Sequence, residues 1–176
     1  YIFSENRSDF TGAIDASGNG SDGSGGFVEI SSHRVVSISG DVTAGIGGTF
    51  LIDPETIVIG SGSETGVSYI SASTLTSALS TSTDVIIWTG VADGYTGTHD
   101  EGWGEGDIVI TDKVEYGSKG NLTFLAVGDI FVNHNIINNQ VLTDAEYDAG
   151  DMANITLVAG WDGVTGKPTI VNPGQG

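Results

Sequence analysis

A repeat with a step of 22 residues is the feature that most restricts how this chain can fold. The segment GGFVEISS begins at Gly25, and the similar segment GGTFLIDP begins 22 residues later, at Gly47. The same step separates GDIVITDKV, which begins at Gly106, from GDIFVNHNI, which begins at Gly128. In both pairs apolar residues return at the same positions, within short alternating runs that are typical of β-strands.

More of the chain fits this scheme once polar insertions are set aside. VVSISG and TIVIG match at a step of 21, and NLTFLAVG matches NITLVAGW at a step of 33 that includes a polar insert. TGAIDASG, at 11–18, resembles SGDVTAG, at 39–45. The alignment predicts that the following residues stack in pairs: Val28 with Phe50, Ile30 with Ile52, Val36 with Ile57, Ile38 with Ile59, Ile108 with Ile130, Ile110 with Val132, Val114 with Ile136, Asn121 with Asn154, Ile14 with Val42 and Gly12 with Gly40.

A period of about 20–25 residues built from short strands is typical of a solenoid. One coil cannot bury its apolar residues alone, whereas stacked coils bury them against each other and pair their backbones at a spacing of roughly 4.8 Å. We therefore expect an all-β solenoid with about 22 residues per coil. Roughly six coils would give a rod about 30 Å long. A β-sandwich remains the alternative, although it does not require a matched step in two separate places.

We expect residues 1–176 to form one solenoid segment, with polar or acidic inserts near 91–106 and 138–153. Such inserts belong at corners, where extra residues cost little. One segment, SYISASTLTSALSTST, does not show the alternating pattern of a β-strand. Its residues Leu75, Ala78 and Leu79 are instead spaced as on one face of a helix. It predicts one short helix near 73–80 against the side or end of the stack, with Ser71 or Ser73 as its N-cap. The alternative is a loop rich in serine and threonine.

The charge of the chain excludes several classes of partner. It has 23 acidic and 5 basic residues, a net charge of −18, and no cysteine. Nucleic acids and anionic membranes bind basic patches, so neither is an expected partner. The lack of cysteine excludes disulfides and thiolate metal sites, and no apolar run is long enough to insert into a membrane. The first residue is Tyr1 and the only methionine is Met152, so we expect a mature or excised piece of a longer chain.

The order of the motifs resembles that of the filamentous haemagglutinin family, large bacterial exoproteins that are secreted by the two-partner route. The resemblance covers about residues 1–160 and rests on SDFTGAIDASG, GGFVEISS, VSISGDVTAG, GGTFLIDPETIVI, ISASTLTSAL and NLTFLAVGDIFVNHNI. It implies a right-handed parallel β-helix and an extracellular or bacterial cell-surface location. It also implies a role in adhesion, biofilm formation or contact-dependent interactions. The asparagine-rich motifs of the family's secretion domain are not present, so the chain looks like a shaft segment.

The segment VADGYTGTHDEGWGEGD, at 91–107, is the strongest candidate for a binding site. Its carboxylates could hold Ca²⁺, or its carboxylates and one imidazole could hold another metal. Its aromatic rings could stack on a sugar. It lacks the ligand spacing of an EF-hand, and the simpler interpretation is an acidic, solvated corner loop with Trp103 packed against a coil. The residues concerned are Asp93, His99, Asp100, Glu101, Glu105 and Asp107, with Tyr95 and Trp103 beside them. A second acidic insert, TDAEYDAGDMAN, carries Asp144, Glu146, Asp148 and Asp151.

We expect no enzymatic activity, and the sequence assigns no catalytic, cofactor-binding or metal-binding residue. The five basic residues are scattered, and the three histidines, His33, His99 and His134, are far apart in the sequence. Carboxylate pairs that cleave glycosides need a shared face. Asn6, Asn121 and Asn154 fit the glycosylation pattern N-x-S/T. Because Asn121 and Asn154 occupy equivalent repeat positions, a stacked structural role is expected for them first.

From these observations we expect the chain to be a structural or adhesive segment of an exoprotein of this family. Such a segment would form a rigid extracellular rod or fibre for cell adhesion or biofilm matrix. The expected partners are other copies, associating end to end or laterally, neighbouring repeats of the parent chain, and host or matrix glycans. The alternative is a carbohydrate-binding or carbohydrate-cleaving module that uses the loop at 91–107. A third interpretation is a secreted β-solenoid fragment with no binding function of its own.

Overall fold

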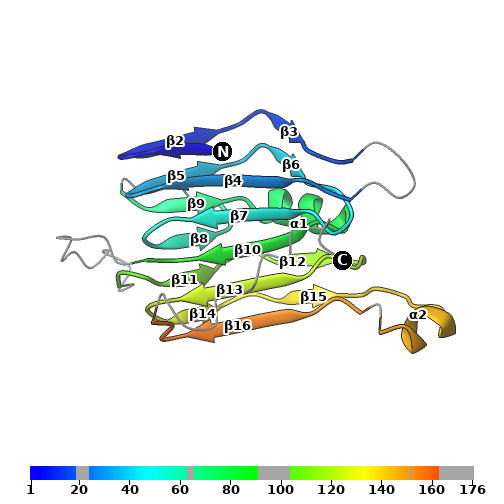
Figure 1. Cartoon of the computed structure of the whole chain (residues 1–176). Coiled ribbons are helices and arrows are strands. Elements are labelled where there is room, and N and C mark those ends of the chain that lie inside the picture. The colour runs from blue at the N-terminus through cyan, green and yellow to red at the C-terminus, as the bar shows by residue number, and fades with distance from the viewer. Residues whose placement is uncertain (19–23, 63–65, 91–103, 151, 163–176) are drawn as a thin grey trace.

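The computed structural model describes residues 1–18, 24–62, 66–90, 104–150 and 152–162, and it consists mostly of parallel β-sheets (Figure 1). Sheet A contains, in spatial order, β1 (Ile2–Ser4), β4 (Phe27–Ser32), β7 (Thr49–Asp53), β10 (Asp84–Trp88), β13 (Leu122–Ala126) and β16 (Ile155–Ala159). Sheet B contains, in spatial order, β2 (Arg7–Phe10), β5 (Val35–Ile38), β9 (Ser68–Ile70), β8 (Ile57–Ile59), β11 (Ile108–Ile110) and β14 (Ile130–Val132). Two smaller sheets pair β3 (Ala13–Asp15) with β6 (Asp41–Thr43), and β12 (Val114–Tyr116) with β15 (Ile136–Asn138).

The strand register confirms most of the stacking that the repeat predicts. Val28 lies on Phe50 and Ile30 lies on Ile52, in the parallel pair of β4 and β7. The steps of 22 and 33 in the second half of the chain also become direct neighbours in parallel strands. The pairs confirmed there and at the N-terminal end are Ile108 with Ile130, Ile110 with Val132, Val114 with Ile136, Leu122 with Ile155, and Ile14 with Val42.

Two different constraints explain the paired glycines of the repeat: close approach of the backbone and a positive φ. A Cβ atom on Gly25 would overlap the carbonyl oxygen of Ala44 and the backbone nitrogen of Gly48. A Cβ atom on Gly48 would overlap the same carbonyl. Gly25 and Gly48 therefore leave no room for a side chain. Gly47, the repeat partner of Gly25, has open space at its Cβ position but a φ of +67°, a conformation that favours glycine.

One row of inward-facing side chains runs through all six strands of sheet A. Its members stack directly on each other, as Ile2, Ile30, Ile52, Ile87, Phe124 and Leu157. The four central side chains have no exposed surface and belong to the main hydrophobic cluster. The core is therefore built by stacking like on like along the sheet, which is how repeat proteins bury their apolar faces.

The predicted stacking of Val36 on Ile57 and of Ile38 on Ile59 is wrong. Strand β9 lies between β5 and β8, so Ile38 faces Ile70, and Ile70 in turn faces Ile59. The chain makes β8 first and then turns back to place β9 nearer the N-terminal end (Figure 1). Ser68 explains part of this order, because its buried hydroxyl accepts a hydrogen bond from the N–H of Val36 at 3.0 Å. A three-residue strand with a serine in it carries too little apolar periodicity to be recognised from the sequence.

The predicted helix is present as α1 (Ala72–Ser80). Ser71 is its N-cap, and the Ser71 hydroxyl accepts a hydrogen bond from the N–H of Thr74 at 3.0 Å. Leu75 and Leu79 are fully buried on one face of the helix. The spacing of the leucines therefore predicted the helix because that spacing forms its buried face.

Helix α1 packs between the two small sheets, against β6 on one side and β12 on the other. An α-helix with its side chains is about 10 Å wide, and two strand spacings amount to roughly 9.6 Å. The helix therefore fills the width of two strands on this side of the molecule. This match of dimensions lets sheet A and sheet B continue past the helix without a break in pairing.

A second helix, α2 (Asp144–Asp148), was not predicted from the sequence. It lies in the insert expected near 138–153, and all of its side chains are half-buried or exposed. Thr143 and Glu146 form a capping box around its first turn. The pattern T-x-x-E is the signal that could have revealed it. Among the described residues, no helix combines the length and the apolar character needed to cross a bilayer.

Candidate functional site

The acidic segment at 91–107 can be assessed only at its C-terminal end. Asp93, Tyr95, His99, Asp100, Glu101 and Trp103 lie outside the described residues. Within the described ranges, no group of three or more His, Asp or Glu side chains could hold a metal ion. The calcium site and the sugar contact proposed for this segment therefore stay predictions.

Asp107 has a structural role at the corner that leads into β11. Its side chain is buried, with one oxygen accepting the N–H of Gly104 at 2.6 Å and the other accepting the N–H of Asp129 at 2.7 Å. Two charge-assisted hydrogen bonds compensate for the loss of water around the carboxylate. A calcium ion bound by Asp107 would compete with these bonds.

The same corner is held from the other side by threonine hydroxyls. The Thr56 hydroxyl donates to the carbonyl of Gly104 at 3.0 Å and accepts the N–H of Gly106 at 3.1 Å. The buried Thr89 hydroxyl donates to the carbonyl of Gly106. Gly106 has a positive φ of 79°, a conformation that favours glycine. These contacts fix the base of the acidic segment to strands β8 and β10.

The second acidic insert leaves from a different corner. Helix α2 lies between β15 and β16, whereas Asp107 lies at the entry to β11. Glu146 is engaged within its own insert, because it accepts the N–H and hydroxyl of Thr143 at 2.9 and 2.8 Å and lies 3.2 Å from the Lys119 ammonium. These contacts lower the pKa of Glu146 from 4.5 to about 2, with the backbone hydrogen bond as the largest cause. Asp144 and Asp148 are exposed, and Asp151 lies outside the described residues.

The predicted asparagine stack is present and is extended by an aspartate. The N–H and side-chain amide of Asn121 both donate to one oxygen of Asp84 at 2.8 Å. The Asn154 N–H and side-chain amide donate in the same way to Asn121, at 2.8 and 3.3 Å. Asn121 and Asn154 are thus structural residues at one corner of three successive passes. Asn6, the third residue with the glycosylation pattern, is exposed.

The two histidines that the structure describes, His33 and His134, do not form a shared site. His33 Nδ1 lies 3.0 Å from a carboxylate oxygen of Glu5, and its ring meets the edge of Phe3 at a centroid distance of 5.1 Å. The His134 Nδ1 accepts the N–H of Asn135 at 3.1 Å, at the opposite end of the stack. His99 lies outside the described residues.

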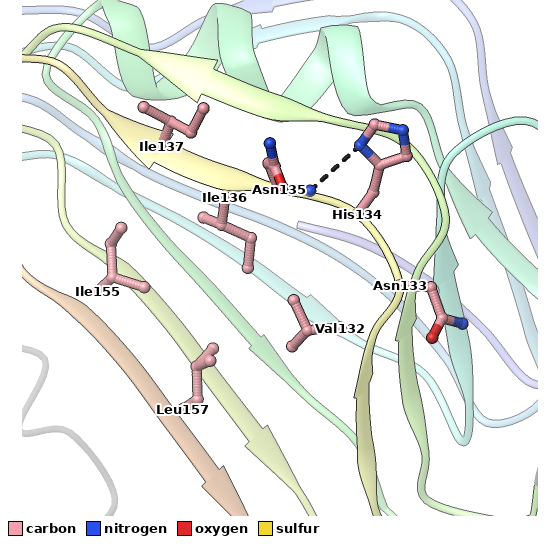
Figure 2. A pocket seen from close by; sticks show the side chains of 8 residues that line it. All are labelled: Val132, Asn133, His134, Asn135, Ile136, Ile137, Ile155 and Leu157. Carbon is pink, nitrogen blue, oxygen red and sulfur yellow. Dashed lines mark hydrogen bonds between the residues drawn. The ribbon is translucent and has the colours of Figure 1, made fainter.

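A hollow of about 430 Å³ lies at the C-terminal end of the described stack. Figure 2 shows that it lies among the last strands of sheet A, sheet B and the β12–β15 sheet. Its lining is mainly aliphatic, with three polar residues at one corner: Val132, Asn133, His134, Asn135, Ile136, Ile137, Ile155 and Leu157.

No family model, curated protein or solved structure matches this chain. The geometry described above is therefore the basis for assigning its function.

Proposed function

We propose that this chain is a structural segment of a secreted bacterial exoprotein of the filamentous haemagglutinin type. In this proposal its strands wind as a right-handed parallel β-helix and form part of a rigid extracellular rod for adhesion or biofilm matrix. The observation that carries the proposal is the continuous row from Ile2 to Leu157, in which each parallel strand stacks on the one before it. Repeated stacking of this kind produces an elongated body of uniform cross-section.

The way in which polar residues are used supports a mechanical role. The side chains of Asp107 and Asn121, and the threonines that contact the corner at 104–107, form hydrogen bonds with backbone groups. The buried hydroxyl of Ser8 likewise donates to the carbonyl of Ser31 at 2.9 Å. Corners fixed by side chains give a stack with little freedom to bend. Neighbouring repeats of a parent chain, other copies of this chain, and host or matrix glycans are the proposed partners.

Binding measurements test this role against the carbohydrate module. In one measurement the labelled chain is applied to a glycan array. In a second, the chain is fused to a small domain with a known ligand and attached to beads, and binding of that ligand is measured. A shaft segment presents the fused domain, and any glycan binding by it does not depend on Trp103 or Asp100. Saturable glycan binding that is lost in Trp103→Ala and Asp100→Ala variants contradicts the shaft proposal and favours a carbohydrate site at 91–107.

A further inference from the structure

Three apolar side chains on the outer face of sheet A are buried although they point away from the core. Strand residues alternate between the two faces of a sheet, so Leu51, Ile86 and Leu125 point opposite to the inward-facing row that contains Ile52 and Ile87. They are only 3%, 7% and 3% exposed. They belong to neither of the two hydrophobic clusters that the described residues form. Their burial therefore requires a cover on the outer side of the sheet.

The neighbouring strands lie beside these residues rather than over them. Leu51 and Ile86 face each other across β7 and β10, which are adjacent strands about 4.8 Å apart (Figure 1). Sheet B shows how such a face can be closed, because its outward-facing Val58 and Val109 form a cluster with other described residues. The residues that pack with them are Val67, Tyr69 and Phe131. Around Leu51 and Ile86 the described residues form no comparable cluster.

The chain turns onto the outer face of sheet A directly after β16. The register pairs Ala126 with Ala159, and regular parallel pairing would join the Ala126 carbonyl to the next N–H, that of Gly160. The carbonyl instead accepts the N–H of Trp161 at 2.8 Å, and Gly160 has a positive φ of 69°. An extra residue of this kind is a β-bulge, which redirects the side chain that follows it. The ring of Trp161 accordingly stacks on the outward-facing ring of Trp88 at a centroid distance of 6.1 Å.

Trp161 covers only one part of the apolar face. Trp88 lies beside Leu125 in the register of β10 and β13, so the stacked rings explain the burial of Leu125. Ile86 lies two residues before Trp88 on the same side of β10, and Leu51 lies one strand farther from β16. The cover must therefore continue past Trp161, across β10 and toward β7.

The two longest ranges outside the described residues, 91–103 and 163–176, both begin near the C-terminal ends of strands of sheet A. Range 91–103 is fixed at both ends to a corner of the stack. The Gly90 N–H donates to the carbonyl of Pro54 at 3.2 Å, and the carbonyl of Gly104 accepts the Thr56 hydroxyl at 3.0 Å. Residues 163–176 instead follow Trp161, which already lies on the outer face. These anchors favour 163–176 as the cover.

The length and composition of this range fit the outer face. In extended form, residues 163–176 would reach roughly 45 Å, whereas β7 is three strand spacings, or roughly 14 Å, from β16. The aliphatic residues in the range are Val164, Ile170 and Val171. They can supply the apolar contacts that Leu51 and Ile86 require.

The charge of this range is complementary to that of the outer face. Residues 163–176 include Lys167 and no acidic residue, in a chain with a net charge of −18. The register places three carboxylates, those of Glu29, Asp53 and Asp84, on the outward side of sheet A. A segment with one positive charge is attracted to this face, whereas most of the chain is acidic and is repelled by it.

We propose that residues 163–176 lie across the outer face of sheet A and cover Ile86 and Leu51 with their aliphatic side chains. The inference rests on this face alone and does not depend on the proposed shaft role. In this arrangement the chain closes an apolar patch that would otherwise favour contact between molecules. One broad side of the stack is thereby occupied by the chain itself and is not available for lateral contacts.

The test measures how fast a thiol reagent reaches the outer face in the full chain, which has no cysteine of its own. Leu51→Cys places the probe under the proposed cover. Val158→Cys is the exposed reference, since Val158 also faces outward in sheet A and is 38% exposed. Ile170→Ser with Val171→Ser weakens the cover, and Thr165→Ser with Thr169→Ser is the matched control within the same range. Circular dichroism and thermal unfolding establish that each variant is folded.

We expect the Leu51→Cys thiol to react with a maleimide at least about tenfold more slowly than the Val158→Cys thiol. Combining Leu51→Cys with the Ile170 and Val171 substitutions should accelerate its reaction by about tenfold or more, the factor expected when a contact loses one buried aliphatic side chain. The threonine substitutions should change the rate by less than about twofold, because they remove no aliphatic side chain. The rate at Val158→Cys should stay the same in all backgrounds.

Two outcomes would overturn the inference. Reaction of Leu51→Cys as fast as Val158→Cys would show that the outer face is not covered. A slow reaction that the Ile170 and Val171 substitutions leave unchanged would exclude residues 163–176 as the cover, and acceleration by Trp103→Ser would then assign it to 91–103. If Leu51→Cys proves unfolded, Ile86→Cys provides the same probe one strand away.

Discussion

Leu157 lies directly on Phe124 in the neighbouring parallel strand, yet Phe124 is fully buried and Leu157 is 42% exposed. The difference shows how burial is achieved in this molecule. Each described pass of the chain covers the apolar row of the pass before it, and no described strand pairs with the far edge of β16. Stability should therefore depend on contacts between passes rather than on contacts within one pass.

The central row gives the first prediction. Ile52 lies between Ile30 and Ile87 and has no exposed surface. Ile52→Ala should lower the free energy of unfolding by about 2–5 kcal/mol, because the lost contacts leave a cavity. Chemical denaturation followed by circular dichroism measures this loss. Ile46→Ala, at a residue that is 69% exposed, should change stability by no more than about 0.5 kcal/mol. Equal effects at the two positions would show that the row is not the core.

The asparagine stack gives a prediction that depends on pH. Asn121→Asp removes the amide that donates to Asp84 and places a second carboxylate beside the first. At pH 7 we expect a loss of about 1–3 kcal/mol of unfolding free energy. Like charges raise the folded-state pKa of the pair above its unfolded value, so the loss should shrink as the pH falls below about 5.

Asn154→Asp is the control for this substitution, because its neighbour in the stack is the neutral Asn121. It should destabilise the chain less than Asn121→Asp does at pH 7. Urea titrations of both variants at pH 7 and pH 4 provide the comparison. A loss at Asn121→Asp that is the same at both pH values would contradict the proposed contact with Asp84.

The order of strands in sheet B can be tested by disulfide formation, since the chain has no cysteine of its own. Ser37 faces Tyr69 in β9, whereas Val58 lies one strand farther away. Adjacent strands are about 4.8 Å apart, within the range that a disulfide spans, and next-but-one strands are about 9.6 Å apart. Ser37→Cys with Tyr69→Cys should oxidise readily to an internal disulfide. Preferential closure of Ser37→Cys with Val58→Cys would support the direct stacking of β5 on β8 instead.

Glu146 gives a local pH prediction. Its pKa is lowered from 4.5 to about 2 by the Thr143 backbone and hydroxyl and by Lys119. Because the folded pKa lies below the unfolded one, the capping box should be intact above pH 4.5 and weaken as the pH falls toward 2. The amide chemical shift of Thr143 should report a titration with a midpoint near 2. Glu146→Gln should abolish that titration, and a midpoint near 4.5 in the wild type would contradict the contact.

Much of the fold could be predicted from the sequence because stacking requires similar residues at a fixed step. The paired glycines at 25 and 47 and the isoleucines at 30 and 52 marked one such step, and the structure stacks the strands that they open. Helix α1 was predicted because its leucines form a buried face. In both cases the residues that form the local sequence pattern also make the packing contacts between strands or between the helix and the core.

The strand order in sheet B and the candidate site were less accessible from the sequence. Strand β9 is three residues long and is held partly by the Ser68 hydroxyl, a polar contact that leaves no periodic signal. The sequence suggested Asp107 as a metal ligand, whereas its carboxylate accepts backbone hydrogen bonds at a turn. An aspartate in the sequence does not distinguish these two roles. The exposure of Leu157 depends on which strands end the described stack, and the repeat alone does not specify that.

Interstrand nuclear Overhauser contacts between β13 and β16 test the central claim most directly. Parallel pairing places Phe124 beside Leu157 and Leu122 beside Ile155, with backbone amide-to-Hα contacts in that order along both strands. We expect this pattern, together with the same pattern between β4 and β7. Strong Hα-to-Hα contacts in the reverse order would indicate antiparallel pairing, as in a β-sandwich, and would contradict the parallel stack on which the proposed rod depends.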